Sequence, residues 1–245
     1  MIAWLGMYDF GPLQAANDRF WQALRRALGD GPERLSRDLD PWQAWTAPDL
    51  LLAQTCGLPF RSRLHDRVTL VATPDHRLPG CPPGYYRSVL IARADATART
   101  LADFAGGTFA YNDPLSQSGW AAPLLQAERD GVCFGAMLET GAHVASARAV
   151  ADGAADVAGI DALTWQLLKD HDPALTRRLT PIGVTVPTPA LPYITAPGGD
   201  APALRHALGT AIAALSPADR QSLHLHGVVE IPAHAYLALP IPHPV

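Results

Sequence analysis

Short apolar runs alternate along the chain with segments in which apolar residues recur at helical spacing. The runs predict buried strands at residues 2–5, 50–53, 68–72, 89–92, 108–111 and 157–160. Leu13, Phe20 and Leu24 mark one amphipathic helix, and Pro12 before them suits its first turn. Further helices are expected from about residue 119, from about residue 142 and over 163–168. This alternation predicts an α/β fold.

Two proline-rich stretches, residues 82–86 and 184–193, interrupt the series. Their prolines enforce an extended path, which suits a chain that crosses from one lobe to another. If both are crossings, residues 1–92 and 187–245 build a first, discontinuous lobe, and residues 93–186 form a second, inserted lobe. The same pattern also fits a single α/β domain with proline-rich loops.

Composition restricts the ligands that such a protein can bind. Hydrophobic residues make up 48% of the 245 residues and charged residues 17%, which is ordinary for a folded protein. The net charge is -4 and Lys169 is the only lysine, so no cluster of basic residues is available for nucleic acid. A bound anion must therefore be held mainly by backbone N–H groups, hydroxyls and a histidine.

The three cysteines, Cys56, Cys81 and Cys133, lack the spacing of a metal site or a redox pair, and we expect no cofactor and no metal. No apolar run approaches the roughly 20 residues of a membrane helix, so we expect no direct insertion into a membrane. The first residues resemble a strand and not a signal peptide. We expect a cytoplasmic protein if Met1 is the native start, and a periplasmic one if the sequence is a trimmed mature form.

The first candidate site follows the predicted strand at 108–111. Ser116 and Ser118 are suited to cap a helix, and Gly119 allows backbone N–H groups to approach a ligand closely. A helix start has free N–H donors and a partial positive charge, so it binds anions without lysine or arginine. The alternative is that Ser118 only caps its own helix. Pro123 indicates that the regular helix starts later than Ser118.

Two further candidates follow in the same predicted lobe. Thr140 is suited to cap a helix, which places His143 in the first turn, where a ring nitrogen can donate to an anion. His143 is also one of nine histidines, and a histidine in such a position is more often an ordinary surface residue. Asp161 stands just after the strand at 157–160, where ligands of open α/β sheets bind, and it fits a cap of the following helix as well.

These segments resemble one known family. Tyr111–Trp120, Thr140–Ser146 and Asp156–Asp161 are similar to the phosphonate- and phosphite-binding family of solute-binding proteins, the type II receptors of ATP-driven importers. The resemblance is strong over roughly residues 100–170 and continues more weakly over the rest of the chain. It implies a type II periplasmic-binding-protein-like fold, with two α/β lobes joined by a two-stranded hinge and the ligand in the cleft.

The resemblance also implies roles for individual residues. Ser116 and Ser118, with the backbone around Gln117, correspond to the residues that take the oxyanion at a helix start. His143 corresponds to a donor on a second helix and Asp161 to an acceptor. From the first lobe, Tyr8 and the turn formed by Gln54 and Thr55 correspond to the positions that close the cleft.

We therefore predict a solute-binding protein that closes over a small oxyanion of the phosphonate, phosphite or phosphate kind and performs no chemistry on it. It would act as an importer receptor, with an ABC-type permease as partner, or as a ligand sensor. A carboxylate at Asp161 repels a fully ionised anion, which favours an oxyanion that carries a proton, or a ligand with an amine, over sulfate.

Two enzyme alternatives remain open from the sequence. Ser118, His143 and Asp161 are residue types that acyl transfer uses, but the chain has no Gly-x-Ser-x-Gly elbow and nothing indicates a base in contact with a nucleophile. A relative of the same fold builds the pyrimidine precursor of thiamine with a histidine and a pyridoxal cofactor. Lys169, the only candidate for a Schiff base, lies in what resembles a helix surface.

Overall fold

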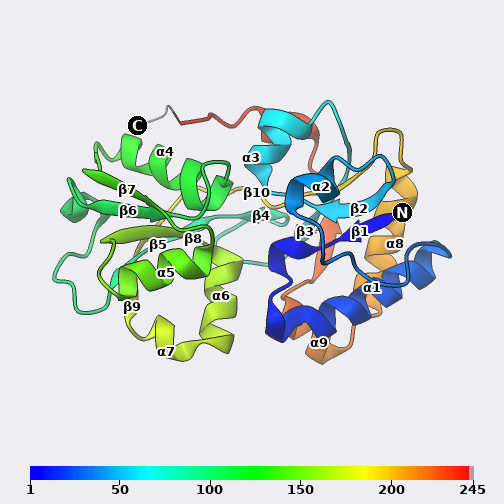
Figure 1. The fold of residues 1–245 in the computed structure, drawn as a ribbon, viewed down its shortest axis with the longest axis horizontal. Helices are drawn as coiled ribbons and strands as arrows, with labels where there is room; N and C mark the ends of the chain where they lie inside the picture. Colours follow the sequence, from blue (N-terminus) through cyan, green and yellow to red (C-terminus); the bar gives the residue numbers. More distant parts are fainter. Residues whose placement is uncertain (243–245) are drawn as a thin grey trace. The chain divides into compact units, whose positions relative to one another are not determined.

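The computed structural model describes residues 1–242, and in it the chain forms two compact units. The first unit is built from Met1–Tyr85 and Pro189–Leu239. The second consists of Tyr86–Thr188 together with the described residues after Leu239. Each unit contains one five-stranded sheet with helices on its faces (Figure 1).

The sheet of the first unit has the order β1-β2-β11-β3-β12. Strand β1 is parallel to β2, and β11 is antiparallel to both of its neighbours, β2 and β3. Its strands are β1 (Ile2–Trp4), β2 (Leu50–Gln54), β3 (Thr69–Asp75), β11 (Tyr193–Thr195) and β12 (Gly227–Val229). Its helical segments are η1 (Gly6–Tyr8), η2 (Gly11–Leu13), α1 (Gln14–Leu28), α2 (Pro41–Trp45), α3 (Gly57–Pro59), η3 (Phe60–Leu64), α8 (Ala201–Ala213), α9 (Pro217–Leu223) and α10 (Ala233–Leu237).

The sheet of the second unit has the order β7-β6-β8-β5-β9. Strand β6 is parallel to β7 and β8, and β5 is antiparallel to β8 and β9. Its strands are β5 (Ser88–Arg93), β6 (Thr108–Tyr111), β7 (Ala136–Glu139), β8 (Val157–Asp161) and β9 (Leu179–Val184). Its helical segments are η4 (Leu101–Phe104), η5 (Gln117–Ala121), α4 (Ala122–Arg129), α5 (His143–Ala151), α6 (Ala162–His171) and α7 (Pro173–Thr176).

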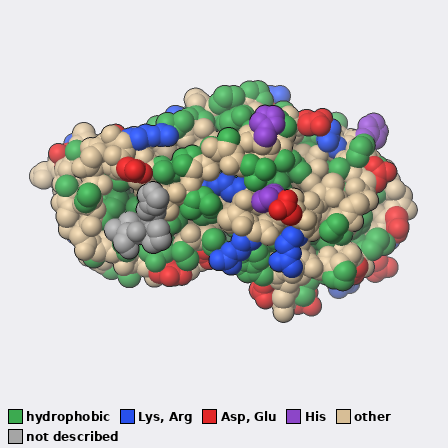
Figure 2. All heavy atoms as spheres, turned by 90° about the horizontal axis from the view of Figure 1, so that it is seen from above, with side chains coloured by type: hydrophobic (Ala, Val, Ile, Leu, Met, Phe, Trp, Pro, Cys, Tyr) green, Lys and Arg blue, Asp and Glu red, His purple; other side chains and the backbone are tan. Residues whose placement is uncertain are grey.

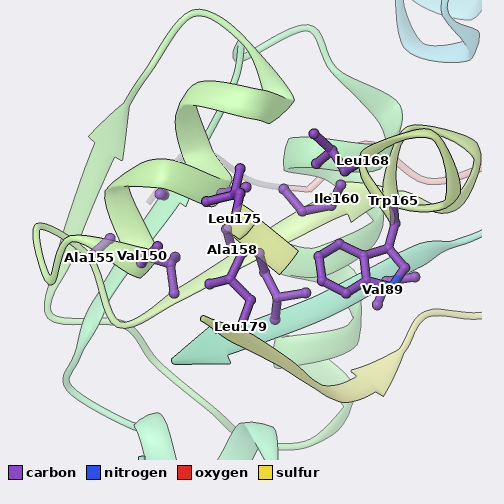
Figure 3. Close-up of a cluster of buried hydrophobic side chains, with 13 residues drawn as sticks. Val89, Val150, Ala155, Ala158, Ile160, Trp165, Leu168, Leu175 and Leu179 are labelled. Atoms are coloured by element: carbon purple, nitrogen blue, oxygen red, sulfur yellow. The ribbon is translucent and has the colours of Figure 1, made fainter. Parts of the chain in front are cut away.

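Both faces of this second sheet are buried, because α4 covers one face and α5, α6 and α7 cover the other (Figure 1). Successive side chains of a strand point to opposite faces, so Val89 and Leu90 of β5 enter different hydrophobic clusters. The cluster on the α5 side joins Ile160 of β8 with Val150, Trp165 and other apolar side chains (Figure 3). Burial on both faces explains why these strands are continuous apolar runs in the sequence.

Two short strands lie where the chain passes between the units. β4 (Tyr85–Tyr86) and β10 (Thr188–Pro189) pair as a two-stranded sheet. The first division of the chain falls at residues 85 and 86, earlier than the expected 92 and 93, because β5 pairs on both of its edges with β8 and β9. Residues 243–245, which were expected to belong to the first lobe, lie outside the described residues.

The topology predicts that the two units differ in their ability to fold alone. The five strands of the second unit all lie within residues 86–188, whereas β11, which lies between β2 and β3 in the first sheet, is absent from residues 1–85. A fragment of residues 86–188 should therefore unfold cooperatively in urea, followed by circular dichroism, and a fragment of residues 1–85 should show no cooperative transition. A cooperative transition in the shorter fragment, or none in the longer one, contradicts this view.

Candidate functional site

The candidate residues of the second unit gather at one edge of its sheet. Strands β6, β7 and β8 run parallel, so their carboxyl ends, at Tyr111, Glu139 and Asp161, lie at the same edge. The three segments that the sequence analysis selected leave the sheet at these residues. Ligands of open α/β sheets bind at this edge.

The start of η5 is capped by Ser116 and not by Ser118. The Oγ atom of Ser116 accepts a hydrogen bond from the backbone N–H of Gly119 at 2.9 Å. Ser116, Gln117 and Ser118 are all buried. The regular helix α4 begins only at Ala122, with Pro123 in its first turn, as the sequence indicated. The hydroxyl of Ser118 is therefore left for another role.

That role includes a contact with His143. The Oγ atom of Ser118 lies 3.0 Å from Nε2 of His143, which is the first residue of α5. Nothing in the sequence indicated a base in contact with a candidate nucleophile, whereas the structure brings Ser118 and His143 into contact. Thr140 was expected to cap α5, but its hydroxyl donates to the backbone oxygen of Tyr111 at 3.0 Å, and the N-cap Ala142 provides no side-chain bond. The first N–H groups of α5 thus lack a side-chain cap.

Two buried polar atoms in this region have no hydrogen-bond partner among the described residues. They are Nδ1 of His143 and Oδ1 of Asn112. Gly119 lies beside both side chains: a Cβ atom there would stand 1.8 Å from Oδ1 of Asn112 and 3.1 Å from Cε1 of His143. Leaving a buried polar atom unpaired costs about 1–3 kcal/mol, so such atoms are most easily understood where a ligand completes their bonds.

The imidazole of His143 is neutral at neutral pH. Burial lowers the pKa of His143 from its ordinary 6.5 to about 4. The nearby backbone of Gly159 opposes this pKa shift without completing a hydrogen bond to Nδ1. His143 can therefore act as a hydrogen-bonding group at this edge, but not as a permanent positive charge.

The helix start is held close to the sheet by two features of the neighbouring strands. The hydroxyl of Ser88, at the start of β5, donates to the backbone oxygen of Ser118 at 2.7 Å. In β8, a Cβ atom at Gly159 would lie 2.3 Å from Cγ of Pro123 and 3.0 Å from the oxygen of Ser118. Glycine at position 159 is thus required for the approach of η5 and α4 to the strand.

Asp161 is the last residue of β8 and is 2% exposed. Its Oδ1 atom accepts a hydrogen bond from the backbone N–H of Thr164 at 2.8 Å, so it caps α6. Of the two roles that the sequence allowed, the cap is therefore present. The ligand role stays a prediction, and it is compatible with the cap because a carboxylate accepts several hydrogen bonds.

The candidates of the first unit also follow strands that end at a common edge, since β1, β2 and β3 all run in one direction. Tyr8 closes η1 after β1, while Gln54 ends β2 and Thr55 follows it. Gln54 and Thr55 are buried and bonded within the unit. Nε2 of Gln54 donates to the oxygen of Leu191 at 3.2 Å, and the backbone N–H of Thr55 donates to the oxygen of Pro192 at 3.0 Å.

His76 is a further polar residue at this edge that the sequence analysis missed. It directly follows β3, which corresponds to the place of Tyr8 after β1 and Thr55 after β2. The sequence feature that could have identified His76 is its position just beyond a buried strand. The strand was expected to end at residue 72, whereas β3 continues to Asp75, so His76 was not predicted to lie at a strand end.

The charged side chains do not form a broad basic surface on the face shown in Figure 2, where basic groups lie in separate places with acidic groups nearby. Several arginines are paired with acids, such as Arg37 with Asp9 at 2.5 Å and Arg178 with Asp152 at 2.7 Å.

Within residues 1–242, no three His, Cys, Asp or Glu side chains are grouped as metal ligands. None of the helices in that range is long and apolar enough to cross a membrane.

The lowered pKa of His143 predicts a dependence of stability on pH. Below its ordinary pKa of 6.5 the unfolded chain binds a proton that the folded chain takes up only near pH 4. The free energy of unfolding should therefore fall as pH is lowered from 6.5 to 4, by at most about 3 kcal/mol from this residue, and stay level above pH 6.5. In His143→Gln the fall should be smaller when both proteins are unfolded in urea at several pH values. Parallel curves for the two proteins contradict the assignment.

Solved structures with similar folds were found by comparison. PhnD1 from Prochlorococcus marinus, in complex with methylphosphonate, is 17% identical and aligns over 91% of this chain and 89% of its own, with a TM-score of 0.73. A binding protein component of the phosphonate ABC transporter of Pseudomonas aeruginosa is 19% identical over 93% and 80%, with a TM-score of 0.73. XAC2383 from Xanthomonas citri, bound to ATP, is 16% identical over 91% and 90%, with a TM-score of 0.66. The chain therefore has the type II fold of periplasmic binding proteins, as the sequence predicted.

A comparison with curated protein sequences finds no match. The sequence profile of one family does match, over residues 52–236, which is well over half of the chain. That family is described as the periplasmic substrate-binding protein of phosphonate ABC transporters. Its profile spans η5, the start of α5, and Asp161. The chain belongs to the phosphonate-binding family of ABC-transporter substrate-binding proteins and is a solute receptor.

Proposed function

We propose that this receptor binds a small oxyanion of the phosphonate, phosphite or phosphate kind at the sheet edge of the second unit, and that it performs no chemistry on it. The observation that carries the proposal is the contact of Ser118 with His143 at the starts of η5 and α5, beside the unpaired buried Nδ1 atom of His143. Neutral donors at two helix starts can bind an anion without the help of a lysine. The one lysine of the chain, Lys169, is exposed in the last turn of α6.

Individual roles follow from this geometry. The N–H groups around Gln117 would donate to the oxyanion. Ser118 and the neutral ring of His143 would add one further donor between them while their contact is kept. That donor is the Ser118 hydroxyl if Nε2 of His143 carries the hydrogen, and Nδ1–H of His143 if the Ser118 hydroxyl donates to Nε2. Ser116 would contribute mainly by holding the first turn of η5 through its bond to Gly119. Asp161 would accept a hydrogen bond from a protonated oxygen of the ligand. From the first unit we propose Tyr8, Gln54 and Thr55 as further contacts, since they follow strands that end at one sheet edge.

The properties of His143 support binding without catalysis. A catalytic serine and histidine need a third group that orients the base, and Nδ1 of His143 has no hydrogen-bond partner among the described residues. A pKa of about 4 also makes His143 a weak general base at neutral pH. A pyridoxal cofactor would require a lysine for its Schiff base, and the exposed position of Lys169 does not favour one.

The role of the receptor in the cell is a separate part of the proposal. The family delivers solutes to ATP-driven importers. We propose an ABC-type permease as the partner if this chain works in import, and a downstream reader of the bound state if it works as a sensor. The compartment would differ accordingly, with a periplasmic protein in the first case.

Replacing Ser118 tests the oxyanion site. A hydrogen bond to a neutral donor contributes about 0.5–1.5 kcal/mol, so Ser118→Ala should weaken binding by up to roughly tenfold. Isothermal titration with phosphite, methylphosphonate and phosphate measures the change. Ser62→Ala is the matched control, because the Ser62 hydroxyl donates only to the backbone oxygen of Leu58 in the first unit. Equal affinities of wild type and Ser118→Ala for all three anions contradict the site.

Asp161→Asn tests the selectivity of the same site. An asparagine keeps an oxygen that can cap α6 at Thr164 but removes the negative charge that repels fully ionised anions. Discrimination against sulfate should therefore relax more than affinity for the tightest-binding phosphonate or phosphite falls. Asp200→Asn is the control, because Asp200 caps α8 in the first unit in the same way. Unchanged selectivity in Asp161→Asn removes Asp161 from the proposed site.

A further inference from the structure

His76 lies at the edge of the first sheet where the candidate residues of that unit are found. It directly follows β3, and its side chain is nine-tenths buried, with 9% exposed. The edge of its ring meets the ring of Tyr8, with centroids 5.8 Å apart and planes at 77°. His76 is therefore in contact with Tyr8, one of the residues proposed above to contact the ligand.

The hydrogen bond of His76 determines where its proton is. Nδ1 lies 2.9 Å from the backbone oxygen of His224, and a carbonyl oxygen only accepts hydrogen bonds, so Nδ1 carries the hydrogen. Burial lowers the pKa of His76 to about 4. The hydrogen bond to the backbone oxygen of His224 and the charge of Asp75 oppose this shift, while the rings of His224 and His226 add smaller contributions in the same direction as burial. The ring is therefore neutral at neutral pH, with a bare lone pair on Nε2.

No group in the described part of the chain donates a hydrogen bond to that lone pair. Nε2 of His76 is buried and has no hydrogen-bond partner among residues 1–242. The carbonyl that fixes the tautomer belongs to His224, which ends α9 in a left-handed conformation, with φ of 46°, and whose N–H is bonded to the oxygen of Gln221 at 3.2 Å. The backbone thus holds in place the carbonyl oxygen that accepts the hydrogen bond from Nδ1–H. Nε2 can then only accept a hydrogen bond, and its partner must be an N–H or O–H group.

We propose that His76 is a specificity-determining residue of this receptor, and that it accepts a hydrogen bond from an amino or hydroxyl group on the organic arm of a phosphonate ligand. The proposal rests on the function proposed above. His76 offers an acceptor, which an ionised oxyanion cannot use. A phosphonate that pairs with His76 must therefore carry a hydrogen-bond donor away from its phosphorus.

Three phosphonates with organic arms of nearly equal size separate the effect of a hydrogen-bond donor on affinity from the effect of the shape of the arm. Isothermal titration should compare 2-aminoethylphosphonate, 2-hydroxyethylphosphonate and n-propylphosphonate, with methylphosphonate as a reference for the oxyanion alone. A site that hydrogen-bonds a ligand group strongly rejects the analogue that lacks it, so the wild type should bind at least one of the donor-bearing ligands about tenfold or more tightly than n-propylphosphonate.

His76→Asn is the informative variant. An asparagine amide can still donate to the oxygen of His224 from near the position of Nδ1, but it has no atom in the place of Nε2. The preference for the donor-bearing ligand should fall to about threefold or less, while affinity for n-propylphosphonate is kept. His206→Asn, on the exposed side of α8, is the matched control and should keep the full preference. Circular dichroism and thermal unfolding check that each variant is folded.

The outcomes separate this inference from the proposed function. If methylphosphonate binds but the three longer ligands bind equally, the role of His76 is wrong and the oxyanion site stands. If none of the phosphonates binds the wild type, both are wrong. A preference that survives in His76→Asn also overturns the role of His76.

Nitrogen NMR of the histidine rings tests the same claim without a mutation. The signals of His76 should show the tautomer protonated at Nδ1, and the Nε2 signal should move when 2-aminoethylphosphonate or 2-hydroxyethylphosphonate is added but not with n-propylphosphonate. A tautomer protonated at Nε2, or an Nε2 signal that responds equally to all three ligands, contradicts the proposal.

Discussion

The contact between Ser118 and His143 depends on how closely two helix starts approach one sheet edge. Gly119 has no side chain, so Asn112 and His143 can come within contact of the first turn of η5. Gly159 has none either, so Pro123 and the oxygen of Ser118 can lie against β8. Ser88 then fixes that oxygen through its hydroxyl. Without these close approaches the hydroxyl of Ser118 and the imidazole of His143 would not lie 3.0 Å apart.

This arrangement explains how the chain can suit an anion with so few cations. A lysine or arginine attracts any anion, whereas hydroxyls, backbone N–H groups and a neutral imidazole require their acceptors in particular positions. Burial keeps His143 and His76 neutral, and each ring has one nitrogen bonded within the chain and one buried nitrogen unpaired among residues 1–242. His143 and His76 are thus alike in environment, although they lie at the edges of different sheets.

The sequence predicted the buried strands well, because burial on both faces leaves a continuous apolar run, as in β5 and β8. It did not predict β7, β9 and β12, which are edge strands with partly exposed residues and, in β9, a proline and a glycine. The central strand β11 was also missed, since it has only three residues and follows a proline-rich segment. Its position between β2 and β3 depends on pairing over long sequence separations, which a local pattern does not contain.

The candidate site shows the same division between local and long-range information. The residue types and their placement after parallel strands could be predicted, because the carboxyl ends of such strands share an edge. The sequence could not predict which serine caps η5, which group Thr140 bonds to, or which nitrogen of His76 carries the hydrogen. Each of these depends on an atom that the fold brings close. His224, which fixes the tautomer, is 148 residues away from His76 in the sequence.

The central claim is that neutral donors at the starts of η5 and α5 bind the oxyanion, and backbone NMR tests it most directly. On titration of the nitrogen-15-labelled protein with methylphosphonate, the largest downfield shifts should come from the amide hydrogens of residues 117 and 118 and from the first turn of α5, since N–H groups that gain a charged acceptor are deshielded. The competing place for an anion is a groove of about 480 Å³ in the first unit, which is lined by Arg25 and Arg34 and also by Asp18 and Glu33. If the largest shifts come from residues around that groove and the amides of residues 117 and 118 are unchanged, the account is contradicted.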